Sequence, residues 1–257
     1  NAHITDNIIV ANNNGVDNYS GSGSYIADNT ITGTQTCAIK NTEYYYSNNY
    51  SANVIIENNF IFPNSGIAID VSNYECNTGY PEYAPIETSI CQGNFNTQIL
   101  NNFIEYQVQS NSNSGKVIEA RYTTIKGNYI KSSQYSSTIY GYGNNITENE
   151  IYSQSSSNYK LIDSDYKDAH SIIEDNYIEN SGSGTTIYGQ NITIRNNRII
   201  GHNNASYAIK IVGPDEHSSI SNNIITTAGN GLFIDSGGLD VDYNVIDCGG
   251  TGIDISN

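Results

Sequence analysis

The sequence predicts an all-β fold, a right-handed parallel β-helix of about ten coils that forms one domain over residues 1–257. A six-residue phrase recurs along the chain, with an aliphatic residue first, Asn fourth and an aliphatic residue last. A second short phrase, rich in β-branched residues, lies about halfway between successive copies. The shortest interval between copies is 21 residues, as from Asn128 to Asn149. A fixed period of this length is typical of a solenoid coil.

The repeated Asn predicts the corner of each coil. A tight corner needs a left-handed backbone, which Asn tolerates better than most residues. Asn side chains stacked at one corner can also form a ladder of hydrogen bonds from coil to coil. We therefore interpret them as structural corners and not as a catalytic set: Asn7, Asn29, Asn59, Asn102, Asn128, Asn149, Asn176, Asn197, Asn223 and Asn244.

The second phrase predicts a short strand in each coil, as in KVIEA from Lys116 and KLIDS from Lys160. Its alternate residues point to one face. One coil cannot bury its inward aliphatic residues alone, but stacked coils bury them as a continuous column. Neither end of the sequence shows a polar cap. We therefore expect a segment of a longer protein, or self-association through uncapped ends.

The longest interval, 43 residues from Asn59 to Asn102, predicts an inserted loop over residues 73–94. Long loops in compact domains often serve function, although this one is equally explained as a tolerated excursion. Cys76 and Cys91 bracket its prolines, and a disulfide between them would remove roughly 3 kcal/mol of unfolded-state freedom. Cys37 and Cys248 lie about eight coils apart, roughly 38 Å at the strand spacing, so they cannot pair with each other.

The net charge of −16 argues against nucleic acid and anionic lipid as partners. No apolar run approaches the ~20 residues of a membrane span. Asn-x-Ser/Thr sequons favour an extracellular, cell-surface location and mark candidate glycosylation sites at Asn18, Asn49, Asn145, Asn191 and Asn204.

One outward column of the second phrase mixes carboxylates, aromatic rings and a lysine: Glu119, Tyr140, Asp163, Tyr188, Lys210 and Asp235. This mixture suits a carbohydrate-binding groove, and it is also compatible with an ordinary solvated face. Glu119 and Asp163 would lie two coils apart, roughly 9.6 Å, which is borderline for a glycosidase pair. Lys210 beside Asp235 is the nearest match to a lyase base. We assign no catalytic residue.

The densest acidic group is Asp163, Asp165 and Asp168. Clusters of oxygen ligands bind Ca2+, although this segment lacks the glycine and the distal glutamate of an EF-hand loop. Ca2+ is therefore the one cation that we consider for this acidic group. We expect no organic cofactor.

The IxxNxI repeats resemble the parallel β-helix repeat of pectate-lyase-like proteins over nearly the whole chain. No position matches the charged active-site sets of those enzymes. Phrases such as ADNTITG and SNNIITTAGNG resemble the adhesin-like surface proteins of methanogenic archaea. That resemblance implies a secreted, non-enzymatic adhesion or structural module, with carbohydrate or another cell-surface protein as partner. The alternative is a carbohydrate-active β-helix enzyme: a polysaccharide lyase, a glycosidase or a phage tailspike.

Overall fold

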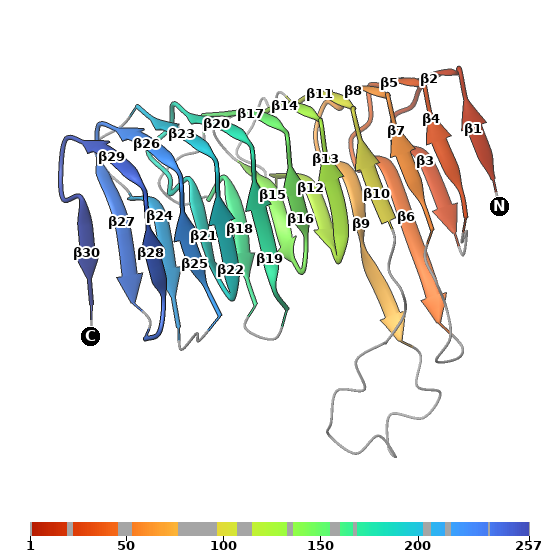
Figure 1. Cartoon of the computed structure of the whole chain (residues 1–257). Coiled ribbons are helices and arrows are strands. Elements are labelled where there is room, and N and C mark those ends of the chain that lie inside the picture. The colour runs from red at the N-terminus through yellow and green to blue at the C-terminus, as the bar shows by residue number, and fades with distance from the viewer. Residues whose placement is uncertain are drawn as a thin grey trace.

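The computed structural model describes residues 2–19, 23–45, 53–76, 97–106, 115–132, 136–154, 160–166, 169–202, 207–213, 217–235 and 237–256. These residues form a solenoid with three parallel sheets of ten strands each (Figure 1). Every coil contributes one strand to each sheet, so strands three apart in sequence are hydrogen-bonded neighbours. The predicted class, an all-β right-handed parallel β-helix, is confirmed.

Sheet A contains the strands that precede the repeated Asn: β1 (His3–Thr5), β4 (Tyr25–Ala27), β7 (Ile55–Glu57), β10 (Thr97–Leu100), β13 (Thr123–Lys126), β16 (Asn145–Thr147), β19 (Ser171–Glu174), β22 (Ile192–Arg195), β25 (Ser219–Ser221) and β28 (Asp240–Asp242). Sheet B contains the strands that follow it: β2 (Ile8–Val10), β5 (Thr30–Thr32), β8 (Phe60–Phe62), β11 (Phe103–Glu105), β14 (Tyr129–Lys131), β17 (Glu150–Ser153), β20 (Tyr177–Asn180), β23 (Arg198–Gly201), β26 (Ile224–Thr227) and β29 (Val245–Cys248).

Sheet C is built from the second phrase: β3 (Asn14–Tyr19), β6 (Cys37–Tyr45), β9 (Ile67–Cys76), β12 (Gly115–Arg121), β15 (Ser136–Tyr142), β18 (Ile162–Asp165), β21 (Ile187–Gln190), β24 (Tyr207–Val212), β27 (Asn230–Asp235) and β30 (Ile253–Ile255). Strand β9 runs through Cys76, so residues 73–76 continue a strand and do not begin the loop.

The core is a set of aliphatic columns that run along the solenoid axis. In sheet A, Ile99 is in register with Ile56 on one side and with Ile125 on the other. All three side chains are fully buried. Burial of an Ile side chain contributes about 1.5–3 kcal/mol, and each further coil repeats that contribution. This repetition explains how a chain with only 37% hydrophobic residues maintains a continuous core.

The repeated Asn side chains form an uninterrupted hydrogen-bond ladder between sheets A and B. Each side-chain amide donates to Oδ1 of the Asn in the next coil, at 2.9–3.0 Å. The backbone N–H of each Asn donates to the same oxygen, as from Asn128 to Asn149 at 2.9 Å. The ladder therefore satisfies buried polar groups along the whole corner.

The predicted left-handed backbone at these Asn residues is wrong by one position. The residue before each ladder Asn has the positive φ, between 53° and 66°. Each of these preceding residues is exposed, whereas the ladder Asn is buried in all but the two end coils. The side chain of a ladder Asn must point into the corner, so the exposed residue before it takes the left-handed conformation instead. The residues with this conformation are Asp6, Asp28, Asn58, Asn101, Gly127, Glu148, Asp175, Asn196, Asn222 and Tyr243.

Two cysteine thiols are free in the part of the chain that the structure describes, those of Cys37 and Cys248. Burial raises the pKa of the Cys37 thiol, so it remains protonated and unreactive. Cys91 and the side chain of Cys76 lie outside the described residues, so the predicted disulfide stays a prediction. No helix in the described ranges is long and apolar enough to cross a membrane.

Candidate functional site

The outward face of sheet C carries the predicted column of mixed polar and aromatic residues. Glu119 is in register with Tyr140, Tyr140 with Asp163, and Asp163 with Tyr188. Lys210 follows Tyr188 in the next coil. The structure thus brings together five of the six residues predicted to share this column. The same column extends beyond them through Asp17, Lys40, Asp70, Phe233 and Asp254.

The sixth predicted member, Asp235, does not belong to the column. Lys210 pairs in register with Phe233, and Asp235 pairs with Val212 two residues further along the strand. The Lys210 ammonium lies 4.7 Å from the centre of the Phe233 ring. Lys210 and Asp235 are therefore not paired in register but are diagonal neighbours on this face, and their pairing as a lyase base and acid stays a prediction.

A unit of lysine, carboxylate and tyrosine occurs on this face. The Lys160 ammonium is 3.2 Å from Oδ2 of Asp163, three residues later. The same ammonium lies 3.6 Å from the centre of the Tyr188 ring in the next coil. An ammonium over an aromatic face is attracted by the ring quadrupole. The Lys160 side chain is thus held between a carboxylate of its own coil and an aromatic ring of the next coil.

The unit recurs two coils earlier with the same geometry. Lys116 Nζ is 2.8 Å from Oε1 of Glu119 and 3.8 Å from the centre of the Tyr140 ring. The recurrence follows from the phrases KVIEA and KLIDS, which place lysine and acid at one spacing on equivalent strands. The result is two like sites along the axis, separated by two coil steps.

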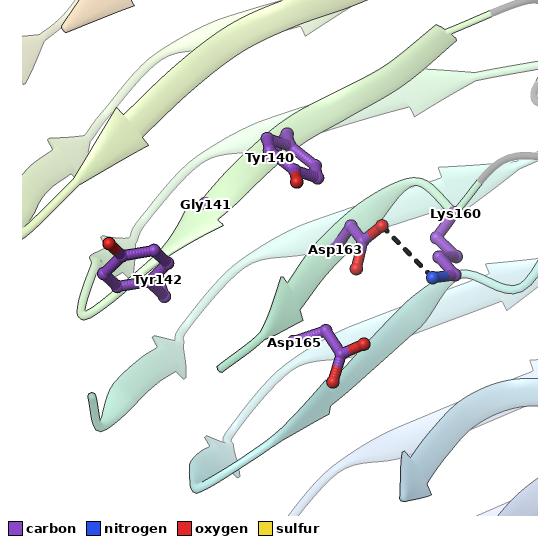
Figure 2. A pocket seen from close by; sticks show the side chains of 6 residues that line it. All are labelled: Tyr140, Gly141, Tyr142, Lys160, Asp163 and Asp165. Atoms are coloured by element: carbon purple, nitrogen blue, oxygen red, sulfur yellow. Dashed lines mark ion pairs between the residues drawn. The ribbon is translucent and has the colours of Figure 1, made fainter. Parts of the chain in front are cut away.

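A shallow depression of about 200 Å³ lies between the two units (Figure 2). Its lining residues come from β15, from β18 and, for Lys160, from two residues before β18: Tyr140, Gly141, Tyr142, Lys160, Asp163 and Asp165. Figure 2 shows Tyr140 near the Lys160–Asp163 ion pair of the next coil, with Tyr142 further along the same strand as Tyr140. The depression therefore offers ring faces, charged donors and carboxylate acceptors within one small area.

Burial controls the protonation of two groups at this depression. Desolvation raises the pKa of Asp163, and the Lys160 ammonium opposes that rise without overcoming it. Desolvation also raises the pKa of Tyr188, with Asp165 and Asp163 adding repulsion against the phenolate. Tyr188 therefore presents a neutral hydroxyl that can both donate and accept a hydrogen bond.

This arrangement is better suited to binding than to hydrolysis. Glu119 and Asp163 are separated by the Tyr140 strand, so they lie two coils apart. Each carboxylate is also paired with a lysine of its own coil. A glycosidase needs two carboxyl groups that face each other across the bond to be cleaved, and one of them must be free to act as the acid.

The predicted cation site has little support from the described residues. Asp165 accepts a hydrogen bond from Gln190 at 2.9 Å, and Asp163 pairs with Lys160. Asp168 lies outside the described residues. Within the described ranges, no group of three or more His, Cys, Asp and Glu side chains could hold a metal ion.

The sequons differ in accessibility. The Asn18 side chain is buried and its amide donates to Asn41 Oδ1 at 2.6 Å, so the folded chain does not offer the nitrogen to which a glycan attaches. Asn145 is exposed, and Asn191 is partly exposed beside His170. Asn49 and Asn204 lie outside the described residues.

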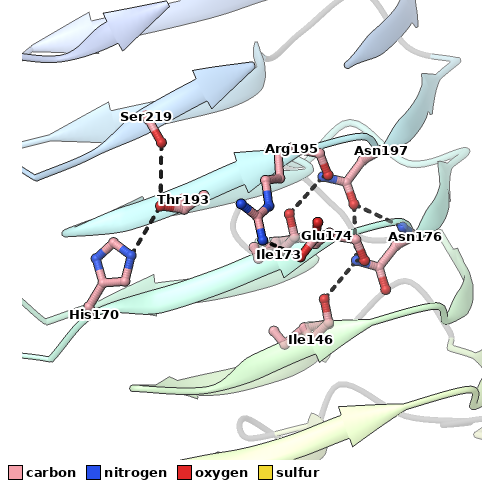
Figure 3. A network of polar contacts seen from close by, with 9 residues as sticks. All are labelled: Ile146, His170, Ile173, Glu174, Asn176, Thr193, Arg195, Asn197 and Ser219. Carbon is pink, nitrogen blue, oxygen red and sulfur yellow. Dashed lines mark hydrogen bonds and ion pairs between the residues drawn. The ribbon is translucent and has the colours of Figure 1, made fainter. Parts of the chain in front are cut away.

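A polar network on sheet A was not predicted (Figure 3). The imidazole of His170 contacts Asn191 Oδ1 at 2.7 Å and Thr193 Oγ1 at 3.0 Å, and Ser219 Oγ donates to Thr193 at 3.3 Å. A threonine thus stands between the imidazole and the serine hydroxyl. The order of these contacts does not match a nucleophile activated directly by a general base.

A row of aromatic side chains on the outside of sheet B was also missed. The signal was present in the sequence, at the variable position between the ladder Asn and the following Ile. That position is aromatic in four coils: Phe60, Phe103, Tyr129 and Tyr177.

Comparison with known proteins agrees with this architecture. The family model described as "Right handed beta helix region" matches residues 108–257, which is more than half of the chain. Searches of curated proteins and of solved structures give no significant match.

Proposed function

This chain belongs to the right-handed β-helix family, and from that premise we propose that it is an extracellular, cell-surface module that binds carbohydrate on sheet C without cleaving it. Its function would be adhesion. The β-helix fold alone is used by enzymes and by non-enzymatic proteins, so the proposal depends on the chemistry of the site.

The observation that supports carbohydrate most directly is the repeated lysine–carboxylate–tyrosine unit. Lys116 and Lys160 are each fixed between an acid and a ring, so their donors are positioned before a ligand arrives. Preorganised groups lose less conformational freedom on binding. A sugar presents hydroxyls to the charged groups and apolar C–H faces to the rings. Two like units along the axis suit a ligand with repeating residues.

The assay that tests the proposal incubates the purified chain with neutral and acidic polysaccharides, with and without Ca2+. Pull-down reports binding, while reducing ends and unsaturated uronate absorbance report cleavage. We expect binding without products. The double variant Tyr140→Ala/Tyr188→Ala should lose that binding. Lys126→Ala is the matched control, because Lys126 forms an exposed ion pair with Glu148 away from sheet C. Binding that survives the double variant would contradict the proposed site.

A carbohydrate-active enzyme is the second candidate, and the carboxyl of Asp163 supports it. A group whose pKa is raised by burial beside a specific charged partner is a common feature of active sites. Products that form with the parent chain and disappear in Asp163→Asn would replace the adhesion proposal with this one.

A further inference from the structure

Six aromatic side chains form a strip on the outward face of sheet B, away from the site on sheet C. They belong to the consecutive strands β8, β11, β14, β17 and β20: Phe60, Phe62, Phe103, Tyr129, Tyr152 and Tyr177. Each ring contacts at least one other, and neighbouring ring centres lie 4.8–6.0 Å apart. The strip therefore runs along the solenoid axis without a gap.

The strip is on the outside because the middle residue of each of these strands points inward. Ile104, Ile130 and Ile151 are fully buried. Their flanking residues face solvent, and Phe60 is 53% exposed. The other five rings are half-buried, so the strip leaves part of each ring in contact with water. Contiguous exposed apolar surface of this kind marks binding sites.

Polar and charged groups line the rings. Lys131 pairs with Glu105 at 2.9 Å. The hydroxyl of Tyr177 donates to Glu179 at 2.8 Å, and His202 contacts the other oxygen of that carboxylate at 3.0 Å. Arg198 also lies 6.0 Å from the centre of the Tyr177 ring, and the hydroxyl of Tyr152 donates to Glu150 at 3.4 Å. The edge of the strip thus offers hydrogen-bond donors and acceptors, with charges of both signs.

We propose that this strip is a second binding site, which takes a linear neutral glycan laid along the solenoid axis. Sugar rings present apolar C–H faces that pack on aromatic rings, and their hydroxyls can bond with the flanking carboxylates and phenols. A repeating polymer can contact one coil after another as the rings recur. The overall charge of −16 repels acidic polymers. At the strip itself the carboxylates of Glu105, Glu150 and Glu179 outnumber the lysine and arginine side chains, Lys131 and Arg198.

The experiment measures binding of neutral hexasaccharides, a β-1,4-glucan, a xylan and a mannan, by calorimetry and by saturation-transfer NMR. We expect at least one to bind the parent chain. Tyr129→Leu/Tyr152→Leu keeps apolar side chains in the strip but removes two rings, and should weaken that binding about ten-fold. Tyr129→Phe/Tyr152→Phe keeps both rings and should bind nearly as well as the parent chain.

Tyr243→Asn is the matched control, because it removes an exposed ring that lies outside both the strip and the sheet C site, at a corner position that Asn also occupies in other coils. It should bind the hexasaccharide with unchanged affinity. Thermal unfolding of each variant separates loss of the site from loss of the fold. Absence of binding by all three hexasaccharides, or binding that the folded Leu variant retains in full, would overturn the proposal. Tighter binding of polygalacturonate than of the neutral hexasaccharides at the strip would also overturn the proposal.

Discussion

The side-chain amide of Asn176 joins three successive coils (Figure 3). Its Nδ2 donates to Oδ1 of Asn197 in the following coil at 3.0 Å and to the carbonyl oxygen of Ile146 in the preceding coil at 2.8 Å. In turn, its Oδ1 accepts from the backbone and side-chain nitrogens of Asn149 at 2.9 and 3.0 Å. One buried residue therefore satisfies polar groups of both neighbouring coils.

Replacement of this residue should show what the ladder contributes. Asn176→Ala leaves buried donors and acceptors on both neighbouring coils unpaired, at about 1–3 kcal/mol each. We expect the free energy of unfolding to fall by at least about 2 kcal/mol in denaturant titrations. The control is Asn145→Ala, which removes an exposed amide and should change stability by less than about 0.5 kcal/mol. Equal effects of the two substitutions would show that the ladder adds nothing to stability.

The burial of an isoleucine side chain should decide how far its removal lowers the free energy of unfolding. Ile173 is fully buried in the sheet A column, whereas Ile224 on sheet B is 53% exposed. Ile173→Ala should therefore cost about 2–5 kcal/mol through lost burial and the cavity left behind. Ile224→Ala removes the same atoms from a solvated site and should cost only a fraction of that. Urea unfolding of both variants, with the same slope against denaturant, measures the difference.

The corner before the ladder should accept glycine and reject β-branched residues. Asp175 is left-handed at φ 56°, and Gly127 occupies the equivalent place two coils earlier at φ 66°. Asp175→Gly should leave stability nearly unchanged, whereas Asp175→Val should cost about 1–2 kcal/mol because two methyl groups on its Cβ crowd the backbone in the left-handed conformation. A melting temperature of the Val variant at or above that of the Gly variant would contradict this reading of the corner.

The fold could be predicted because a solenoid repeats the same short structural unit, the coil. Each coil needs an inward aliphatic residue and a corner that satisfies its own polar groups, so both recur in the sequence. The chemistry of the corner was harder to predict, since the ladder and the turn fall on neighbouring residues. The pattern shows the constant Asn at 176 but hides the varied, exposed residue at 175 that takes the left-handed backbone.

The site was only partly predictable because alternation does not determine register. A slip of two residues keeps every side chain on the same face, so Leu232 and Ile234 are equally good inward partners for Ile209 in the sequence. The structure pairs Ile209 with Leu232, which places Phe233 and not Asp235 in the column. The sheet B strip was overlooked for a different reason: four of its six rings occupy the variable position of the repeat, and the other two follow the inward isoleucine.

The carboxyl of Asp163 should make stability depend on pH in a direction opposite to that of an ordinary paired acid. Because burial raises its pKa in the folded state, the folded chain binds this proton more tightly than the unfolded chain does. Its contribution to the free energy of unfolding is therefore present at acid pH and is lost as the pH rises through the carboxyl range. Asp163→Asn cannot titrate, so its melting temperature should fall less than that of the parent chain between about pH 4 and 7.

Lys160→Gln gives the complementary test, since the Lys160 ammonium is the main group that lowers the pKa of Asp163. Without it, the pKa of this carboxyl should rise further and the fall in melting temperature with pH should become steeper than in the parent chain. Two substitutions on one ion pair thus move the same slope in opposite directions. A general loss of packing would shift both melting curves downward at every pH and leave the slopes alike, which would rule out burial of this carboxyl as the cause.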